Sequence, residues 1–178
     1  FVIEKDQNLA FNLKNIFKDQ LEVINDDILN IDENSIFKEN VIVFGNLPYN
    51  ISTEILSKWI LNLNNTFWFD HLVLMFQKEV ADRIVAHFNT SAYGRLAILT
   101  NWRLKVKKIC DIGPECFSPR PKVNSSLLHF IPKNNFKLIG QDSIIPTKRY
   151  SKKILYNIRF HLTPICQCVL TNNQKSVF

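Results

Sequence analysis

Residues 41–50 read Val-Ile-Val-Phe-Gly-Asn-Leu-Pro-Tyr-Asn, and this stretch decides how the rest of the chain is interpreted. Four apolar residues are typical of a short buried strand, and the Gly-Asn-Leu-Pro that follows ends the strand abruptly in a turn. An amide, a rigid proline and an aromatic ring then stand together at the carboxyl end of the strand. In an open α/β sheet, ligands bind at that end. The turn is therefore the first candidate functional site.

Asn46, Leu47, Pro48 and Tyr49 carry groups that can hold a planar base by its exocyclic amine. The amine of adenine is a poor nucleophile because its lone pair is delocalised into the ring, and two acceptors around its hydrogens would free that pair. The Asn46 side-chain oxygen and the Leu47 carbonyl are the candidate acceptors, and Pro48 has no N–H to compete with them. The Tyr49 ring offers a stacking surface worth about 1–3 kcal/mol. The alternative is a tight turn in which these residues serve only backbone geometry.

Strand and helix patterns alternate on both sides of this turn. Patterns typical of strands lie at 1–3, 21–24, 41–44, 71–77, 105–112 and 123–131, and helical patterns lie at 7–19, 52–63, 78–87 and 96–102. Such alternation predicts an α/β fold. From Pro132 onward the composition changes to a linker and a basic segment. We therefore expect one domain at 1–132 and a separate extension at 133–178.

The overall composition indicates a globular protein with an anionic partner. The 178 residues are 46% hydrophobic and carry a net charge of +6. A positive charge balance favours nucleic acid first and an anionic membrane second, although a basic protein without such a partner fits charge alone equally well. No apolar run has the length of a transmembrane helix, and the first residues lack the apolar segment of a signal peptide. We expect a cytoplasmic protein without membrane association.

The four cysteines are too few and too irregularly spaced for a disulfide framework. Cys110 and Cys116 are expected to be small core or loop residues in a reducing compartment. Cys166-Gln167-Cys168 is a lone C-x-C motif, and His161 is the only nearby further ligand. A zinc site needs two more ligands, so we expect no metal.

Two acidic residues follow strand patterns near the start of the chain. Glu4 follows residues 1–3, and Asp27 follows residues 21–24. In doubly wound folds a carboxylate at the end of the second strand accepts hydrogen bonds from a ribose diol, and Glu4 fits that position. Asp27 is placed to accept a hydrogen bond from an adenine amine. The alternative is that both are ordinary polar residues at strand ends.

Four blocks of sequence, taken together, resemble one family of enzymes. Val-Phe-Gly-Asn-Leu-Pro-Tyr-Asn-Ile-Ser-Thr at 43–53 resembles the catalytic motif of the KsgA-type ribosomal RNA adenine dimethyltransferases. Three further blocks resemble later motifs of that family: Phe-Gln-Lys-Glu-Val-Ala-Asp-Arg-Ile at 76–84, Ala-Tyr-Gly-Arg-Leu at 92–96 and Phe-Ser-Pro-Arg-Pro-Lys-Val-Asn-Ser-Ser at 117–126. The blocks keep their order over residues 1–131.

The resemblance implies a Rossmann-like methyltransferase that uses S-adenosylmethionine. Its expected reaction is dimethylation of two adjacent adenosines in a small-subunit rRNA hairpin during ribosome biogenesis. Its expected partner is that rRNA or the pre-ribosomal subunit, bound by a monomer. The cofactor-binding residues implied are Glu4 at the ribose, Asp27 at the adenine and Asn46, which touches both the methionine moiety and the target amine.

The resemblance also implies which residues meet the RNA. Leu47, Pro48 and Tyr49 complete the target-base pocket with Asn46, and Phe117 packs the other face of the base. A basic set is assigned to RNA binding: Arg120, Lys122, Lys148, Arg149, Lys152 and Lys153. The alternative for this set is solvated surface charge.

The chain departs from the family at both ends. The family's first strand and Gly-rich cofactor loop precede the Val-Ile-Glu-Lys-Asp block at 2–6, and no G-x-G occurs in this sequence. We expect an N-terminally truncated chain that binds cofactor poorly or not at all. The missing strand would lie between strands 1–3 and 41–44, so the sheet is expected to lack it and to close up or stay split. Residues 133–178 are interpreted as a linker and the remnant of a C-terminal RNA-binding helical region.

Two other functions stay open. The absent Gly-rich loop favours a catalytically inactive RNA-binding remnant that acts in ribosome assembly. A related adenine methyltransferase acting on large-subunit rRNA is the second, and Leu47 and the Tyr-Gly-Arg-Leu block at 93–96 count against it.

Overall fold

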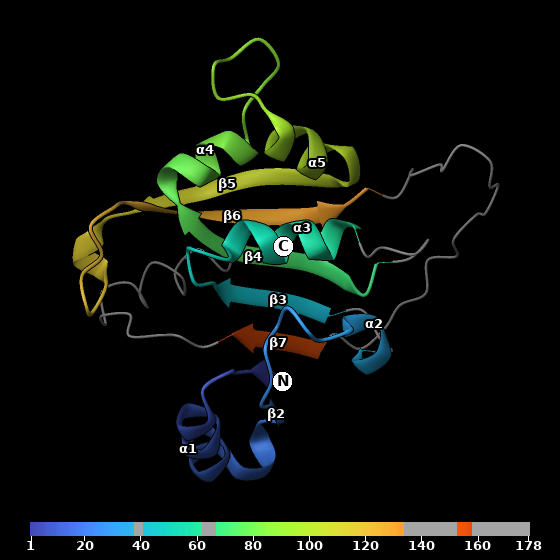
Figure 1. Cartoon of the computed structure of the whole chain (residues 1–178), viewed down its shortest axis with the longest axis vertical. Coiled ribbons are helices and arrows are strands. Elements are labelled where there is room, and N and C mark those ends of the chain that lie inside the picture. Colours follow the sequence, from blue (N-terminus) through green and yellow to red (C-terminus); the bar gives the residue numbers. More distant parts are fainter. Residues whose placement is uncertain (38–40, 62–66, 134–152, 158–178) are drawn as a thin grey trace, which may run out of the picture.

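The computed structural model describes residues 1–37, 41–61, 67–133 and 153–157 (Figure 1). Its elements are β1 (Val2–Ile3), α1 (Gln7–Phe17), η1 (Lys18–Gln20), β2 (Val23–Ile24), α2 (Glu33–Ile36), β3 (Val41–Asn46), α3 (Ser52–Leu61), β4 (Phe69–Gln77), α4 (Lys78–Ile84), α5 (Arg95–Arg103), β5 (Leu104–Ile112), η2 (Pro114–Cys116), β6 (Ser125–Pro132) and β7 (Lys153–Asn157). The alternation of strands and helices predicted up to residue 131 is confirmed, and α2 is an additional short helix.

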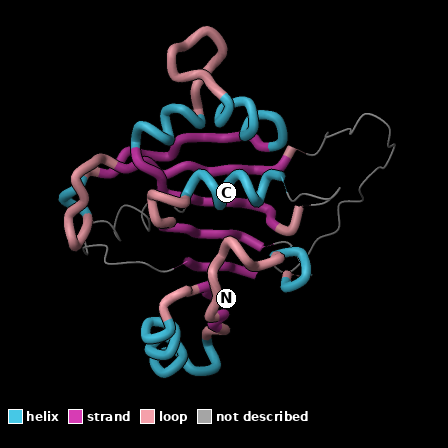
Figure 2. The backbone as a smooth tube through the Cα atoms, viewed as in Figure 1, coloured by secondary structure: helices cyan, strands magenta, loops and turns pink. Residues whose placement is uncertain are grey.

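The strands form one seven-stranded sheet in the order β2-β1-β7-β3-β4-β6-β5 (Figures 1 and 2). β2, β1, β7, β3 and β4 run parallel, whereas β6 is antiparallel to both of its neighbours. A parallel sheet with an antiparallel edge is common in α/β proteins. The predicted α/β fold class is confirmed.

One strand takes a position that the sequence did not predict. β7 pairs in parallel with β1 on one side and with β3 on the other, in the slot where we expected the sheet to close up or stay split. That expectation was wrong for a physical reason: two facing strand edges leave backbone groups unpaired, and an Ile-Leu-Tyr segment of high strand propensity satisfies both. Residues 153–157 are therefore extended rather than helical. The domain division at 132/133 stays a prediction.

The main core lies between the sheet and helices α3, α4 and α5; Figure 1 shows α3 in front of the strands and the other two beside β5. The predicted apolar face of the helix after the turn is buried, with Ile55, Leu56, Trp59 and Ile60 all at most 2% exposed. This helix packs on β3 and β4, so burial of its apolar face fixes where the turn before it sits.

A buried ion pair joins α2 to α3. The Glu33 carboxylate is 2% exposed as a residue and accepts hydrogen bonds from Lys58 Nζ at 2.8 Å and from Trp59 Nε1 at 2.6 Å. Lys58 also donates to the carbonyls of Ile28 and Ile31. Because Ile28 and Ile31 lie between β2 and α2, this cluster ties the β1–β2 edge to the helix that follows the turn.

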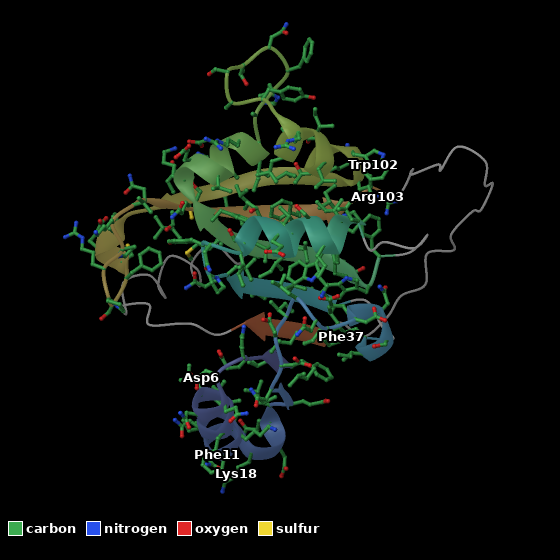
Figure 3. All side chains as sticks on the ribbon, viewed as in Figure 1. Asp6, Phe11, Lys18, Phe37, Trp102 and Arg103 are labelled. Atoms are coloured by element: carbon green, nitrogen blue, oxygen red, sulfur yellow. The ribbon has the colours of Figure 1, made fainter. Side chains whose placement is uncertain are left out.

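Helix α1 has a capped N-terminus, but little of the helix is buried against the rest of the protein. Asp6 caps it by accepting hydrogen bonds from the N–H groups of Asn8 and Leu9. The helix predicted at 7–19 forms, yet in α1 only Ala10 is buried, while Phe11 is 64% and Ile16 70% exposed (Figure 3). Helix α5 ends at the other side of the molecule, where the Arg103 guanidinium lies 4.5 Å from the ring centroid of Trp102 (Figure 3).

Candidate active site

The carboxyl ends of the parallel strands meet at one edge of the sheet, on the left in Figure 1. The antiparallel strands complete this edge, because Ser125 at the start of β6 pairs with Gln77 at the end of β4 and with Ile112 at the end of β5. Segments from residues 46, 77, 112 and 125 are thus brought together, although they lie far apart in the sequence.

The turn after β3 is fixed from both sides. The Pro48 carbonyl accepts a hydrogen bond from the Ile51 N–H at 3.1 Å, and the buried Ser52 hydroxyl donates to the Tyr49 carbonyl at 3.1 Å. The Leu47 side chain is 2% exposed and belongs to the main core. The backbone of the turn is therefore held by a core anchor and by the first turn of α3.

Asn46 and Leu47, the two predicted acceptors, lie at the carboxyl end of β3. Asn46 is the last residue of β3, is half-buried and pairs with Met75 of β4. Among the described residues, none donates a hydrogen bond to the Leu47 carbonyl. A carbonyl without a protein donor at this edge has a lone pair available to a ligand amine.

Gly45 is needed by the packing behind the turn. A Cβ atom at this position would lie 2.8 Å from Leu74 Cδ2 and 3.0 Å from Leu47 Cδ2. Both leucines are almost completely buried. The missing side chain therefore lets Leu47 seat in the core while Asn46 stays at the sheet edge.

Tyr49 is held by a residue that the sequence analysis did not single out. Its hydroxyl lies 2.6 Å from Ser125 Oγ, and Ser125 is completely buried. This hydrogen bond spans 76 positions and joins the turn to the start of β6. Ser125 belongs to the block at 117–126, but no sequence pattern indicates that its hydroxyl contacts Tyr49.

Phe117 lies on the loop between β5 and β6, at the same edge. It packs on a small cluster of Met75, Ile112 and Leu127, apart from the main core. Among the described residues its ring makes no contact with the Tyr49 ring, so the structure brings the two predicted stacking residues to one edge without joining them.

A network of charged side chains lies beside this loop. Asp111 accepts a hydrogen bond from the buried Ser126 hydroxyl at 2.6 Å and pairs with Lys78 at 3.3 Å and Lys108 at 3.1 Å. The Ser126 hydrogen bond is the largest cause that lowers the pKa of Asp111 to about 2. The network ties α4, β5 and β6 together next to Ser125. Sequence reasoning missed it because its members come from three separate elements.

The two predicted acids lie at the ends of β1 and β2. Glu4 is 8% exposed, and its Oε1 accepts the N–H of Asp6, which is labelled at the start of α1 in Figure 3. Asp27 accepts a hydrogen bond from Lys5 Nζ at 2.7 Å and from the Leu29 N–H at 3.0 Å. The hydrogen bond from Lys5 is the main cause that lowers the pKa of Asp27.

The sequence profile of the family described as "Ribosomal RNA adenine dimethylase" matches residues 1–142. The chain belongs to this family. A dimethylase-family relative named "Ribosomal RNA small subunit methyltransferase A", from Pelagibacter ubique (strain HTCC1062), is 64% identical over 136 residues, which cover 76% of this chain and 52% of the relative. A protein of the same name from Zymomonas mobilis is 43% identical over 66% of this chain and 42% of its own length.

Two solved structures are similar to this dimethylase-family chain. A dimethyladenosine transferase from Plasmodium falciparum has a TM-score of 0.64 and 31% identity, covering 74% of this chain and 47% of that one. The 23S rRNA methyltransferase ErmE has a TM-score of 0.61 over 74% of this chain and 51% of its own, and at 22% identity it shows a shared fold. The chain spans about half the length of the curated relatives it matches.

The acids of this dimethylase-family chain fit one part of S-adenosylmethionine. Glu4 Oε1 is engaged by the Asp6 N–H, whereas no described residue donates to Glu4 Oε2. A buried carboxylate with one oxygen fixed and the other available suits a ribose diol. Asp27 is engaged by Lys5, so an adenine amine would share its carboxylate with that lysine.

The predicted RNA-binding residues are only partly described. Arg120 and Lys122 are exposed on the loop after Phe117, and neither forms an ion pair with another described residue. Lys153 begins β7, while Lys148, Arg149 and Lys152 lie outside the described residues.

Two further findings concern metals and membranes. Within the described ranges, no group of three or more His, Cys, Asp or Glu side chains is placed to hold a metal ion, and Cys166 and Cys168 lie outside those ranges. The helices in the described part of the dimethylase-family chain are too short or too polar to cross a bilayer.

Proposed function

We propose that this chain carries the target-adenine site of an enzyme that dimethylates the exocyclic amines of two adjacent adenosines in a small-subunit rRNA hairpin, with S-adenosylmethionine as methyl donor. Membership of the adenine dimethylase family supports the reaction class. The single observation that carries the site assignment is the turn at 46–49, fixed by Leu47 and Ser125, with the Leu47 carbonyl free of described protein donors.

The turn would act on the amine by positioning and electrostatics. The Asn46 side-chain oxygen and the Leu47 carbonyl accept the two amine hydrogens, which draws the nitrogen towards tetrahedral geometry and frees its lone pair. Pro48 keeps a competing N–H out of the site, and Tyr49 and Phe117 stack on the base. The base must be unpaired or flipped out to reach them. No strong general base is required.

The methyl donor, S-adenosylmethionine, would be held by the carboxylates of Glu4 and Asp27. Glu4 binds the ribose through its available oxygen, and Asp27 accepts from the adenine amine. When bound, S-adenosylmethionine supplies an electrophilic methyl group on a sulfonium sulfur. Asn46, between the two sides, orients the amine towards that methyl group.

The wider setting is part of the same proposal. Arg120, Lys122 and the basic segment with Lys148, Arg149, Lys152 and Lys153 would contact rRNA phosphates. The working form would be a cytoplasmic monomer that acts on the small-subunit rRNA or the pre-ribosomal subunit. Sedimentation of the purified chain checks the monomer.

Substitution of Asn46 tests the site directly. Methyl transfer is measured as tritium moved from labelled S-adenosylmethionine to small-subunit rRNA, with dimethyladenosine identified by mass spectrometry. In a full-length version of the protein, Asn46→Ala should lower the rate by about 10²-fold or more, because one of two acceptors is lost, while RNA binding stays close to wild type. Asn12→Ala is the matched control, since it removes the same amide from an exposed position on α1, away from the turn. Full activity of Asn46→Ala would overturn the assignment.

Calorimetry separates this proposal from an inactive RNA-binding role in ribosome assembly. Saturable binding of S-adenosylmethionine to the chain, weakened by Glu4→Gln, would favour the methyltransferase. RNA binding without cofactor binding and without methyl transfer would favour the inactive role for this chain.

A further inference from the structure

The loop between α4 and α5, residues 85–94, stands out from the rest of the molecule (Figures 1 and 2). It is internally ordered, because the Thr90 N–H and hydroxyl both reach the His87 carbonyl, and the Tyr93 N–H donates to the Thr90 carbonyl at 3.0 Å. Asn89 adopts a positive φ of 67°. A projecting loop with its own hydrogen bonds presents side chains at fixed positions.

An aromatic pair is displayed on this loop. Phe88 is 76% exposed, the highest value among the large hydrophobic side chains of the described residues. Its ring meets the half-buried Tyr93 ring edge-to-face, with the centroids 5.8 Å apart and an interplanar angle of 87°. Tyr93 therefore steadies Phe88 and leaves one broad apolar face turned to solvent.

A cationic pocket lies at the base of the loop. It has a volume of about 390 Å³ and is lined by Arg83 and residues 91–96. Its two charged lining residues are Arg83 and Arg95, and no acidic residue lines it. Arg83 is paired with Glu79 at 2.5 Å, whereas Arg95 is exposed and forms no ion pair with another described residue. The net charge at the pocket is positive, which is complementary to a phosphate.

Neither the backbone conformation nor the local packing requires a glycine at position 94. Its φ of −159° and ψ of −165° are extended values that any residue adopts, and a Cβ atom there would meet no atom within 4 Å. It is the residue before α5, where serine, aspartate or asparagine would stabilise the helix better. The remaining physical use of glycine is to let a ligand approach the backbone closely.

We propose that this loop and pocket bind an unpaired RNA nucleotide that flanks the target adenosine, with its phosphate at Arg95 and Gly94 and its base stacked on Phe88. The inference rests on the proposed function for the RNA partner. Helix α4, which starts directly after β4, is about 10 Å long at 1.5 Å per residue. The loop is therefore one short helix away from the sheet edge that carries the turn, and an RNA chain with its target base at the turn would extend along α4 to reach it.

Three variants and two controls test this site by fluorescence anisotropy with a labelled single-stranded RNA oligomer, titrated over a range of KCl concentrations. Phe88→Leu keeps the apolar character but removes the ring, and should weaken binding by about 5- to 150-fold at every salt concentration. Arg95→Gln should reduce the salt slope by about 1. The controls, Phe11→Leu and Lys14→Gln on α1, make the same changes on another exposed surface and should bind like wild type.

Gly94→Ser separates ligand contact from folding. The serine cap should leave the melting temperature unchanged or raise it, while the added atoms weaken RNA binding. If the loop variants bind as tightly as the α1 controls, or if Phe88→Leu weakens duplex RNA as much as single-stranded RNA, the loop site is wrong. Loss of methyl transfer in Asn46→Ala would still hold in that case, so the two proposals fail separately. A wild-type chain that binds no RNA would contradict both.

Discussion

The two parts of the candidate active site are built very differently. The target-base part stands on β3, β4 and β6, which have six, nine and eight residues, and its Tyr49 is locked to a completely buried serine. The cofactor part stands on β1 and β2, which have two residues each, and its Asp27 is held by a lysine whose side chain is 76% exposed.

This difference indicates which part is preorganised by this chain's own packing. Hydrogen bonds between buried groups keep one geometry, because breaking them leaves unsatisfied polar atoms. A surface ion pair exchanges with water at little cost. The geometry of the turn should therefore survive changes of solvent that leave Asp27 free to move. Four predictions test this contrast, beginning with the contact that joins the two parts.

Lys58→Met should have the largest effect on stability. It leaves the Glu33 carboxylate buried without its cationic partner, and breaking a buried pair from one side costs about 3–5 kcal/mol. Urea denaturation of the full chain measures the loss in the free energy of unfolding. Lys14→Met, on an exposed face of α1, should change it by less than about 0.5 kcal/mol. If Lys58→Met and Lys14→Met lowered the free energy of unfolding equally, the buried cluster of Glu33, Lys58 and Trp59 would not join the two parts.

Gly45→Ala should have the second-largest effect on stability. The new methyl group is forced against Leu74 and Leu47, both buried, and overpacking of this kind costs about 1–3 kcal/mol. Gly113→Ala is the matched control, because the three atoms nearest to its Cβ would all belong to the exposed Glu115 side chain, which can rotate away. Thermal melting followed by circular dichroism compares them. A Gly45→Ala chain as stable as the control would show that the turn is not packed as tightly as the leucine contacts indicate.

Loss of the Tyr49–Ser125 hydrogen bond should have a smaller effect on stability. Ser125→Ala and Tyr49→Phe should each cost about 0.5–1.5 kcal/mol, and the double variant should cost hardly more than either one, since the same bond is lost. A double-mutant cycle in urea measures this coupling. Strictly additive costs would mean that the two hydroxyls act independently and that the turn is held without them, by Leu47 and by its hydrogen bonds to the start of α3.

Local patterns predicted the strand, the turn and the helix around residues 46–49 well, because the signals are close together in the sequence. An apolar run followed by Gly-Asn-Leu-Pro fixes where β3 ends, and the spacing of Ile55, Leu56 and Trp59 fixes the face of α3. These signals lie within a few residues of one another. The partner of Tyr49 is 76 positions away and is a common serine, so only the folded chain reveals it.

The features that the sequence did not predict depend on partners that lie far away along the chain. β7 was interpreted as part of a helical region, because its basic surroundings resemble an RNA-binding segment. Its place between β1 and β3 depends on strand edges more than a hundred residues upstream. The Glu33 cluster was missed for the same reason, since residues 28–39 have no periodicity and their anchor lies in α3.

Lys5→Gln should have the smallest effect on stability, and it tests the cofactor part. The pKa of Lys5 is raised and that of Asp27 lowered by their hydrogen bond. The pair therefore contributes only between the acidic range, where Asp27 gains its proton, and the range above pH 10.5, where Lys5 loses one. At pH 7 the urea midpoint should not change measurably, because the pair is exposed to solvent and screened.

The same variant should nevertheless change the titration of Asp27. Without Lys5, the pKa of Asp27 should rise towards its ordinary value of 3.8, which carboxyl ¹³C chemical shifts follow by NMR. The Asp111 carboxyl, held by Ser126, should keep its pKa of about 2 in the variant and serves as the internal control. An unchanged Asp27 titration would show that the Leu29 N–H, and not Lys5, holds this carboxylate, and the cofactor part would then be as fixed by its own backbone as the turn is.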